Sequence, residues 1–264
     1  MARKKDGKDL FEKYFHEEYQ DRWPHLYHAM QADRQRYISI TQDPELTYKA
    51  LIGLTDHPAE GYHIDPASME AVLALDIQKG DRVWDACAAP GGKALIILRI
   101  LAGSGMLTVS DISSSRAHRL RRNLEQFGIY KNYEVNIGDM IEMQCPVFDK
   151  ILLDAPCSSE RHWIEKDMLD DWRVGRTRHL SVRQHALLCR AWDVLKPGGL
   201  LVYSTCSISK KENDGVIKQF LKKRNAVVKP SYHAEKSEYG TMILPDTHMG
   251  QGPIYFCVLE KPTI

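Results

Sequence analysis

Residues 83–98 read VWDACAAPGGKALIIL, and this stretch decides the fold class. Its apolar start is typical of a buried strand, and its apolar end is typical of a helix. Between them, Gly91 and Gly92 allow the backbone to pass close to a ligand. The free amides of the helix start favour a negatively charged group there. The stretch therefore predicts a strand, a ligand-binding turn and a helix, the first unit of an α/β sheet.

The same alternation continues to the C-terminus. Strands are expected at 82–86, 105–112, 133–139, 148–156, 200–206, 226–230 and 254–260, with helices at 65–77, after residue 93, and at 113–128, 181–195 and 210–224. Strands that alternate with helices form right-handed crossovers and a parallel sheet. We therefore expect an α/β fold with a mostly parallel, seven-stranded sheet.

The first 61 residues have a different pattern. They are polar and helix-like from about residue 9 to residue 55, with aromatic side chains near helical spacing, and Pro24 fits the first turn of a second helix. We expect these aromatics to pack on the main domain rather than to stack on bases. The predicted organisation is an N-terminal helical extension at 1–61 and a catalytic domain at 62–264.

Acidic residues close three successive strands. Asp85 ends the first strand, Asp111 ends the second, and Asp139 follows the third. Ligands of parallel sheets bind beyond the carboxyl ends of the strands, where an acid after the second strand can accept from ribose hydroxyls. The turn lacks the GxGxxG spacing of dinucleotide binders. The pattern therefore favours S-adenosylmethionine over a nicotinamide cofactor.

Composition narrows the class of protein. The chain has 264 residues, 43% of them hydrophobic, and a formal net charge of +1, so it is neither disordered nor strongly basic. Its start, MARKKDGKDL, lacks the apolar core of a secretory signal, and no run is long enough to cross a bilayer. The six cysteines include no CxxC pair, which favours reduced thiols. We expect a cytoplasmic protein, or an organellar-matrix one if a targeting segment has been removed.

Two cysteines follow adjacent predicted strands. Cys157 lies in LLDAPCSSERHW and Cys206 in YSTCS. Each taken singly is more often a small buried hydrophobe than a nucleophile. Beside a methyl donor, however, a thiolate can add to carbon 6 of a pyrimidine and so activate carbon 5. Asp154 suits the role of a carboxyl group at the ring nitrogen of the base.

Four motifs together resemble one family. DACAAPGGK at 85–93, DAPCS at 154–158, STCS at 204–207 and the following EN at 212–213 are similar to the signature motifs of the Sun-type (NOL/NOP/Sun) RNA cytosine-5 methyltransferases. The resemblance covers the chain from about residue 62, and residues 11–30 are similar to the entry segment of the short mitochondrial rRNA and tRNA members. It implies a Rossmann-like, S-adenosylmethionine-dependent methyltransferase fold.

The resemblance also implies roles for individual residues. Cys206 would attack the base, Cys157 would assist product release, and Asp154 and Lys93 would complete the catalytic set. The residues implied in cofactor binding are Cys87, Ala88, Ala89, Pro90, Gly91, Gly92, Lys93, Asp111, Arg116, Asp139 and Asp154. The usual C-terminal DGFF of the family is represented here by GQGPIYF at 250–256. No metal site is predicted, because Cys157 and His162 lack the paired spacing of zinc ligands.

Three interpretations are weighed. The first is a monomeric enzyme that makes 5-methylcytosine in structured RNA, with rRNA favoured and tRNA next, acting away from membranes. Its RNA specificity would come from the N-terminal helices, from basic stretches such as 116–122 and 222–230, or from a protein partner, although both stretches can equally be solvated helix faces. The second is a DNA cytosine-5 methyltransferase, against which the STCS motif speaks. The third is an RNA-binding or assembly factor without catalysis, which the presence of both cysteines disfavours.

Overall fold

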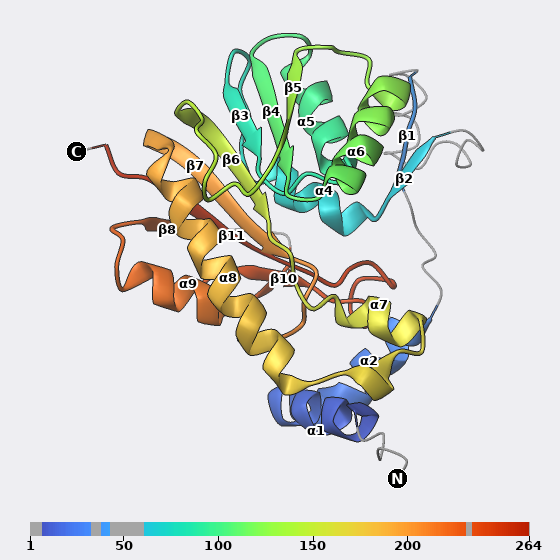
Figure 1. Ribbon diagram of the computed structural model, residues 1–264. Coiled ribbons are helices and arrows are strands. Elements are labelled where there is room, and N and C mark those ends of the chain that lie inside the picture. Colours follow the sequence, from blue (N-terminus) through green and yellow to red (C-terminus); the bar gives the residue numbers. More distant parts are fainter. Residues whose placement is uncertain (1–6, 33–37, 43–60, 231–233, 264) are drawn as a thin grey trace.

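The computed structural model describes residues 7–32, 38–42, 61–230 and 234–263. A single large sheet runs through the molecule and helices cover both of its faces (Figure 1). The strands are β1 (Ile38–Ile40), β2 (Tyr62–Ile64), β3 (Arg82–Asp85), β4 (Met106–Asp111), β5 (Tyr133–Ile137), β6 (Phe148–Asp154), β7 (Leu195–Thr205), β8 (Val227–Lys229), β9 (Glu235–Lys236), β10 (Thr241–Ile243) and β11 (Ile254–Glu260). The helices are α1 (Gly7–Tyr19), η1 (Gln20–Arg22), α2 (Trp23–Gln31), α4 (Pro66–Leu73), α5 (Gly92–Leu101), α6 (Ser114–Phe127), α7 (Glu160–Glu165), η2 (Leu169–Asp171), α8 (Val174–Asp193) and α9 (Asp214–Leu221).

The centre of the large sheet is parallel, as the sequence predicts. The strand order is β5-β4-β3-β6-β7-β11-β10-β9, and β8 pairs with β11. The first five strands of this order are parallel, and β11 is antiparallel to β7, with Tyr255 opposite Thr205. The carboxyl ends of β3, β4, β6 and β7 therefore meet at one edge, where ligands of such sheets bind.

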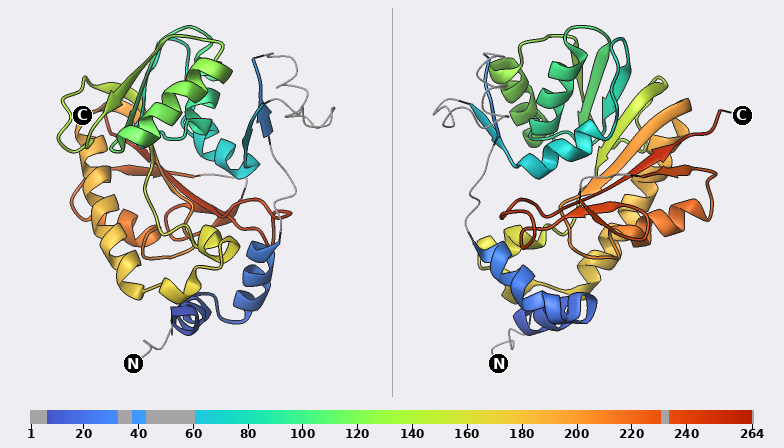
Figure 2. Two further views of the ribbon diagram at one scale, coloured as in Figure 1. Left: turned by 45° about the vertical axis from the view of Figure 1, so that its right-hand side comes forward. Right: turned by 180° about the vertical axis from the view of Figure 1, so that it is seen from behind.

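Alternate residues of the central strands enter two different cores. Trp84 faces a core formed with α8, α9 and the N-terminal helices, whereas its neighbour Val83 faces a core formed with α4, α5 and α6. Figure 2 shows these two groups of helices on opposite sides of the sheet. Both faces of a parallel sheet must be covered in this way, which explains the nearly continuous apolar runs of β6 and β7.

The N-terminal helices belong to the first of these cores. Phe11, Phe15 and Trp23 are at most 2% exposed, and the ring of Phe11 meets that of Trp172 edge-on at 5.4 Å. The prediction that these aromatics pack rather than stack on bases is therefore confirmed. The proposed boundary at residue 61 stays a prediction. β1 and β2 pair across it, with Ile38 opposite Ile64.

The sheet is larger than the sequence predicts. It has nine strands in the described residues instead of seven, because β9 and β10 add short antiparallel strands beyond β11. Helix α8 begins at Val174, not near residue 181, and the short α7 and η2 precede it. Short elements such as these carry too little periodicity to be read from sequence. No helix in the described part of the chain is both long and apolar enough to cross a bilayer.

Candidate active site

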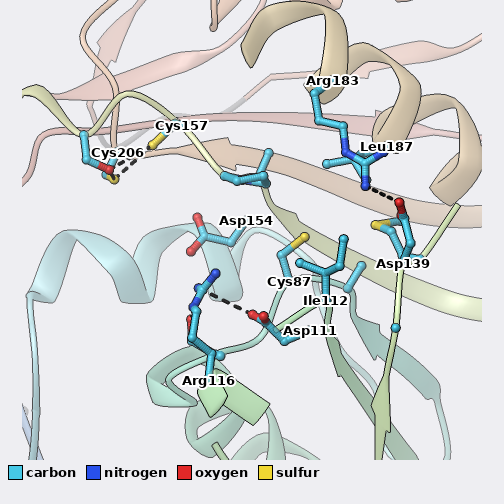
Figure 3. A pocket seen from close by; sticks show the side chains of 17 residues that line it. Cys87, Asp111, Ile112, Arg116, Asp139, Asp154, Cys157, Arg183, Leu187 and Cys206 are labelled. Carbon is cyan, nitrogen blue, oxygen red and sulfur yellow. Dashed lines mark hydrogen bonds and ion pairs between the residues drawn. The ribbon is translucent and has the colours of Figure 1, made fainter. Parts of the chain in front are cut away.

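The four predicted catalytic side chains meet at the carboxyl edge of the sheet. Asp154 ends β6 and Cys206 directly follows β7, while Cys157 lies in the loop after β6 and Lys93 in the first turn of α5. Figure 3 shows Cys157, Cys206 and Asp154 around one pocket. Parallel pairing of β6 with β7 places Asp154 opposite Ser204, so residues about fifty positions apart become neighbours.

The two thiols are in direct contact. The Sγ atoms of Cys157 and Cys206 are 3.1 Å apart, and Ser159 Oγ lies 3.0 Å from Cys206 Sγ. Hydrogen bonds from Cys157 and Ser159 favour the thiolate and lower the pKa of Cys206, and the nearby Lys93 charge helps. The pKa of Cys157 is raised, first by its contact with Cys206 and then by burial. The pair therefore contains one activated thiol, Cys206, which is also the exposed one.

Lys93 and Asp154 form an ion pair beside the thiols. Lys93 Nζ donates to Asp154 Oδ2 at 2.7 Å, and Ser204 donates its hydroxyl to Asp154 Oδ1 at 2.8 Å. Burial disfavours the charged form of Lys93, but the Asp154 carboxylate outweighs it and raises the pKa of the lysine. The carboxylate is held in one orientation with a proton donor on each oxygen.

A cavity of about 250 Å³ lies on the β4 side of this cluster. Asp111 and Arg116 form one wall, with Arg116 Nη2 at 3.4 Å from Asp111 Oδ2 and at 2.7 Å from the carbonyl of Ala89. Asp111 is 3% exposed, and its other oxygen accepts from the Ser113 amide at 3.0 Å. A buried carboxylate at the end of the second parallel strand is the acceptor that ribose hydroxyls require.

The opposite wall carries a second acid and an apolar slot. Arg183 of α8 donates to Asp139 Oδ2 at 2.6 Å and, although partial burial opposes it, lowers the pKa of that carboxyl. Ile112 and Leu187 line the cavity next to this pair (Figure 3). Ile112 is 59% exposed, which is unusual for so large an apolar side chain. These two residues give this part of the cavity an apolar lining of the kind that an aromatic base can contact.

Asp85 supplies an acceptor without a donor. Its carboxylate is 1% exposed, and within the described residues neither oxygen meets a hydrogen-bond partner. Burial, and then the charge of Asp154, raise the pKa of Asp85 to about 8. A buried orphan acceptor calls for a donor such as an ammonium group. Asp85 lines a smaller hollow that shares Cys87 and Asp154 with the cavity of Asp111 and the apolar slot. Together these acceptors and the slot fit S-adenosylmethionine, which carries an ammonium, a ribose and an adenine.

Residues of the loop at 87–93 line two hollows, the cavity of about 250 Å³ and a smaller one beside it. Cys87 and Ala89 line the cavity, while Ala88, Pro90 and Gly92 line a smaller hollow that includes Asp85 and Lys93. A Cβ atom on Gly91 would lie 2.9 Å from Leu120, and one on Gly92 would lie 2.8 Å from Tyr62. In the structure the space that these glycines leave open is thus filled by protein side chains from α6 and β2.

A further hollow opens on the other side of Cys206. Its walls include Asp65, Lys93, His162 and the 250–256 segment through Gly252. Asp65 Oδ2 accepts from the Gly252 amide at 2.9 Å, and the buried Arg161 donates to the carbonyls of Gly250 and Gly252 at 2.6 Å. The unusual GQGPIYF segment therefore forms a wall of a hollow that the activated thiol also lines.

Several site residues carry no signal in the sequence. Ser159, Arg183 and Asp65 come from a loop, a helix and a helix cap, and only the fold brings them to the cluster. Trp163, next to His162, packs against the core with Arg176 stacked 5.0 Å above its ring, whereas His162 is exposed and lines the hollow. No cluster of three His, Cys, Asp or Glu residues suited to a metal occurs among the residues that the structure describes.

Comparison with known proteins gives a family match and several relatives. Residues 72–259 match the family described as "16S rRNA methyltransferase RsmB/F". The chain is 33% identical over 221 residues to the mouse "tRNA (cytosine(34)-C(5))-methyltransferase, mitochondrial", covering 76% of this chain and 63% of the relative. It is 31% identical over 241 residues to the mouse "5-cytosine rRNA methyltransferase NSUN4", covering 80% of this chain and 61% of the relative.

Two solved structures from Pyrococcus horikoshii are also similar. A "methyltransferase homolog protein" has a TM-score of 0.79 and 25% identity, covering 99% of this chain and all of that one. "NSun6 from Pyrococcus horikoshii with SFG" has a TM-score of 0.69 and 26% identity, covering 77% of this chain and 53% of that one. Compared with the two mouse relatives, the chain spans less than two thirds of their length, namely 63% and 61%. The family match nevertheless includes all four motifs between residues 85 and 213, and the chain belongs to the 16S rRNA methyltransferase RsmB/F family.

Proposed function

We propose that the chain methylates carbon 5 of cytosine in RNA, with S-adenosylmethionine as the methyl donor and Cys206 as the nucleophile. The observation that carries this proposal is that an activated thiol, in contact with a second thiol, and a carboxylate oriented by Lys93 line the same cavity. The names of the mouse relatives, which are RNA cytosine methyltransferases, support it. The NSun6 structure holds SFG, an analogue of S-adenosylmethionine, which supports the cofactor.

The residues suit the chemistry of an unreactive carbon. Carbon 5 of a pyrimidine attacks an electrophile only after a group has added to carbon 6, and a thiolate adds well. In the proposed reaction the Cys206 thiolate bonds to carbon 6 while the Asp154 carboxyl group gives a proton to ring nitrogen 3. The Lys93 ammonium, 2.7 Å from Asp154 Oδ2, is the source of that proton. S-adenosylmethionine supplies an electrophilic methyl group when it is bound.

The second half of the reaction restores the ring. Once carbon 5 carries the methyl group, it loses its proton, the carbon–sulfur bond to Cys206 breaks, and nitrogen 3 gives its proton back. The raised pKa of Cys157 keeps it a neutral thiol, and its Sγ atom lies 3.1 Å from that of Cys206. In the proposed step the Cys157 thiol gives its proton to the departing Cys206 sulfur and takes up the proton that leaves carbon 5, so Cys157 ends the step as a thiol again. We therefore assign product release to Cys157 and attack to Cys206.

The RNA class is the finer part of the proposal. We place rRNA first and tRNA second, since relatives named for both match at similar identity. A monomer that works alone or with a protein partner, in the cytoplasm or an organellar matrix, is the corresponding expectation.

The test is methyl transfer from radiolabelled S-adenosylmethionine to total RNA and, separately, to DNA. We expect label in RNA alone, and none with the Cys206→Ala variant as a matched blank. Label in DNA would instead support a DNA cytosine-5 methyltransferase. A protein that binds S-adenosylmethionine and RNA but transfers no label would be a catalytically silent RNA-binding factor.

A further inference from the structure

Two buried glutamates lie behind the cysteine loops. Glu160 begins α7, three residues after Cys157, and Glu212 precedes α9, six residues after Cys206. Both side chains are 0% exposed. Carboxylates are almost never fully buried unless they are paired, so this placement needs a reason.

Each carboxylate holds the loop of the other cysteine. Glu212 Oε2 accepts from the amide of Ser158 at 3.0 Å, and Glu212 Oε1 accepts from the Ser158 hydroxyl. Ser158 directly follows Cys157. In the other direction, Glu160 accepts from the Ser207 hydroxyl and from the Ile208 amide, both at 3.0 Å. Ser207 directly follows Cys206. Each glutamate thus follows one cysteine in the chain and is hydrogen-bonded to the loop of the other cysteine. The two sets of hydrogen bonds therefore connect the two loops to each other.

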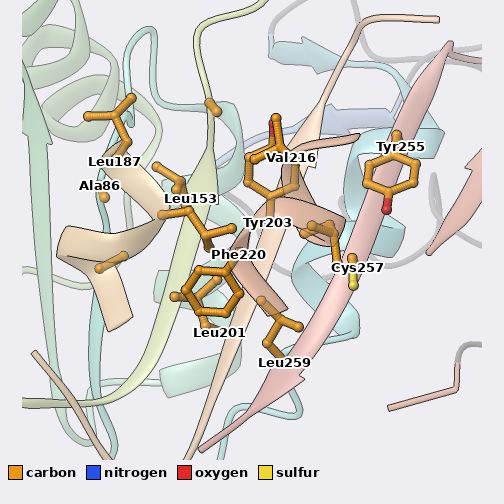
Figure 4. Packing of buried hydrophobic residues seen from close by; sticks show 14 of the residues in the cluster. Ala86, Leu153, Leu187, Leu201, Tyr203, Val216, Phe220, Tyr255, Cys257 and Leu259 are labelled. Atoms are coloured by element: carbon orange, nitrogen blue, oxygen red, sulfur yellow. The ribbon is translucent and has the colours of Figure 1, made fainter. Parts of the chain in front are cut away.

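The ties are anchored in the scaffold. Gln184 of α8 donates to Glu212 Oε2 at 2.8 Å and to the carbonyl of Pro156 at 3.0 Å. Tyr203 of β7, whose side chain lies in the core (Figure 4), donates its hydroxyl to the backbone carbonyl of Glu212 at 2.6 Å. Fixed neighbours of this kind are what hold reacting groups in a productive arrangement.

We propose that Glu160 and Glu212 are positioning residues that form a cross-brace between the two cysteine loops. This brace sets the distance between the two thiols, and it holds only while the two glutamates together carry a single negative charge. The inference rests on the proposed function for its activity measurement, and on the geometry alone for its thiol measurement. It assigns a role to Glu160 that no motif indicates.

The charged groups around Glu160 and Glu212 explain why the brace should hold only while the two glutamates share one negative charge. Glu212 faces Arg176 of α8 and Cys157, while Glu160 faces Glu212 and Tyr19 from the end of α1. Burial, and then the charge of Glu212, raise the pKa of Glu160 to about 8, and burial raises that of Glu212. Near neutral pH the pair therefore keeps a proton. Loss of that proton places two like charges in one buried site, where they repel.

The first experiment measures the thiol without RNA or methyl donor. Alkylation of Cys206 by iodoacetamide is followed by mass spectrometry between pH 6 and pH 9.5 in the wild type, Glu160→Ala, Glu160→Gln and Glu142→Gln. We expect about tenfold slower alkylation at pH 7 in Glu160→Ala, the effect of a one-unit rise in a thiol pKa. Glu160→Gln should stay near the wild type, because a carboxamide oxygen still accepts from Ile208. Glu142 is an exposed carboxyl, so its variant is the control.

The second experiment uses the intact enzyme and its RNA. We expect wild-type methyl transfer to fall as the pH rises past about 8, and the Glu160→Gln variant, which cannot ionise, to keep its activity there. The comparison of the wild type with Glu160→Gln stays informative even if Glu160→Ala does not fold, because the carboxamide of Glu160→Gln keeps the brace in an uncharged form.

Two results would overturn the brace. One is a wild-type alkylation profile in folded Glu160→Ala; the other is an unchanged alkaline decline of activity in Glu160→Gln. Failure of the proposed function has a different signature. If the chain methylates no RNA at all, the alkylation profiles still decide whether Glu160 positions Cys206.

Discussion

The carboxylates on the two sides of the proposed active site have different kinds of partner. On the cofactor side, Asp111 and Asp139 pair with Arg116 and Arg183, whose side chains are 51% and 35% exposed. On the thiol side, Glu160 and Glu212 are fully buried, and they accept hydrogen bonds from hydroxyl, amide and carboxamide donors. Exposed ion pairs contribute little free energy and can rearrange when a ligand enters, whereas removing a partner from a buried charge is costly. We therefore expect the proposed cofactor side to rearrange more readily than the thiol side.

The largest effect is expected within the thiol side. Cys206→Ala should lower methyl transfer by at least about 10³-fold and form no covalent complex, since nothing else adds to carbon 6. Cys157→Ala should attack and methylate but release slowly. Denaturing electrophoresis with labelled RNA would then show a protein–RNA complex for Cys157→Ala alone. If Cys206→Ala formed the complex and Cys157→Ala did not, Cys157 would be the attacking thiol and Cys206 the one that assists release.

The next effect tests the carboxylate between the two sides. Asp154→Asn keeps the shape of the side chain and an acceptor for Ser204 but removes the acid and its pair with Lys93. Loss of a proton-transfer group typically lowers the rate by about 10²- to 10⁴-fold. We expect this loss in single-turnover rate, measured with saturating S-adenosylmethionine. Unchanged turnover would remove Asp154 from the chemistry.

The two cofactor-side acids should differ from each other. Asp111→Ala removes a buried carboxylate and should weaken S-adenosylmethionine binding by about 1.5–3 kcal/mol, the range for hydrogen bonds to charged groups. Asp139→Ala should have a smaller effect, because its carboxyl is 24% exposed and already satisfied by Arg183. Titration calorimetry on both variants measures the difference. Equal affinities for Asp111→Ala and the wild type would contradict the assignment of the ribose site.

The last effect concerns stability and its dependence on pH. The pKa of Asp85 is raised to about 8, so the folded state holds a proton that the unfolded state releases near pH 4. Its contribution therefore lowers the free energy of unfolding as the pH rises from about 4 to about 8. Asp85→Asn should show a weaker decline over that range in denaturant titrations. A decline as steep as that of the wild type would mean that Asp85 does not carry the proton.

The sequence predicted those parts of the site that lie in unbroken motifs. The 85–93 loop, Asp154, Cys157 and Cys206 are next to strands with strong apolar runs, so both their element and their end of the sheet could be inferred. Arg183 and Glu160 could not be inferred, since they lie in helical stretches with no local signal, and only the packing of α7 and α8 brings them to the cluster. Gly91 and Gly92 show a related limit. Sequence indicates that a side chain is not tolerated there, whereas only the structure identifies Leu120 and Tyr62 as the neighbours that exclude it.

The position of β7 has a consequence for the RNA. The strand that ends just before Cys206 is hydrogen-bonded on one side to β6 and on the other to β11, so its backbone has neighbours along both edges. If Cys206 is the nucleophile, as we propose, the paired strand leaves it little freedom to move towards a base. The proposed RNA substrate must then turn its cytosine out of the stack to reach the sulfur, which takes a few kcal/mol and least where the base is already unpaired. We therefore expect RNAs to be distinguished by how readily a cytosine leaves its stack. A cytosine in a loop should be methylated faster than the same cytosine in a perfect duplex.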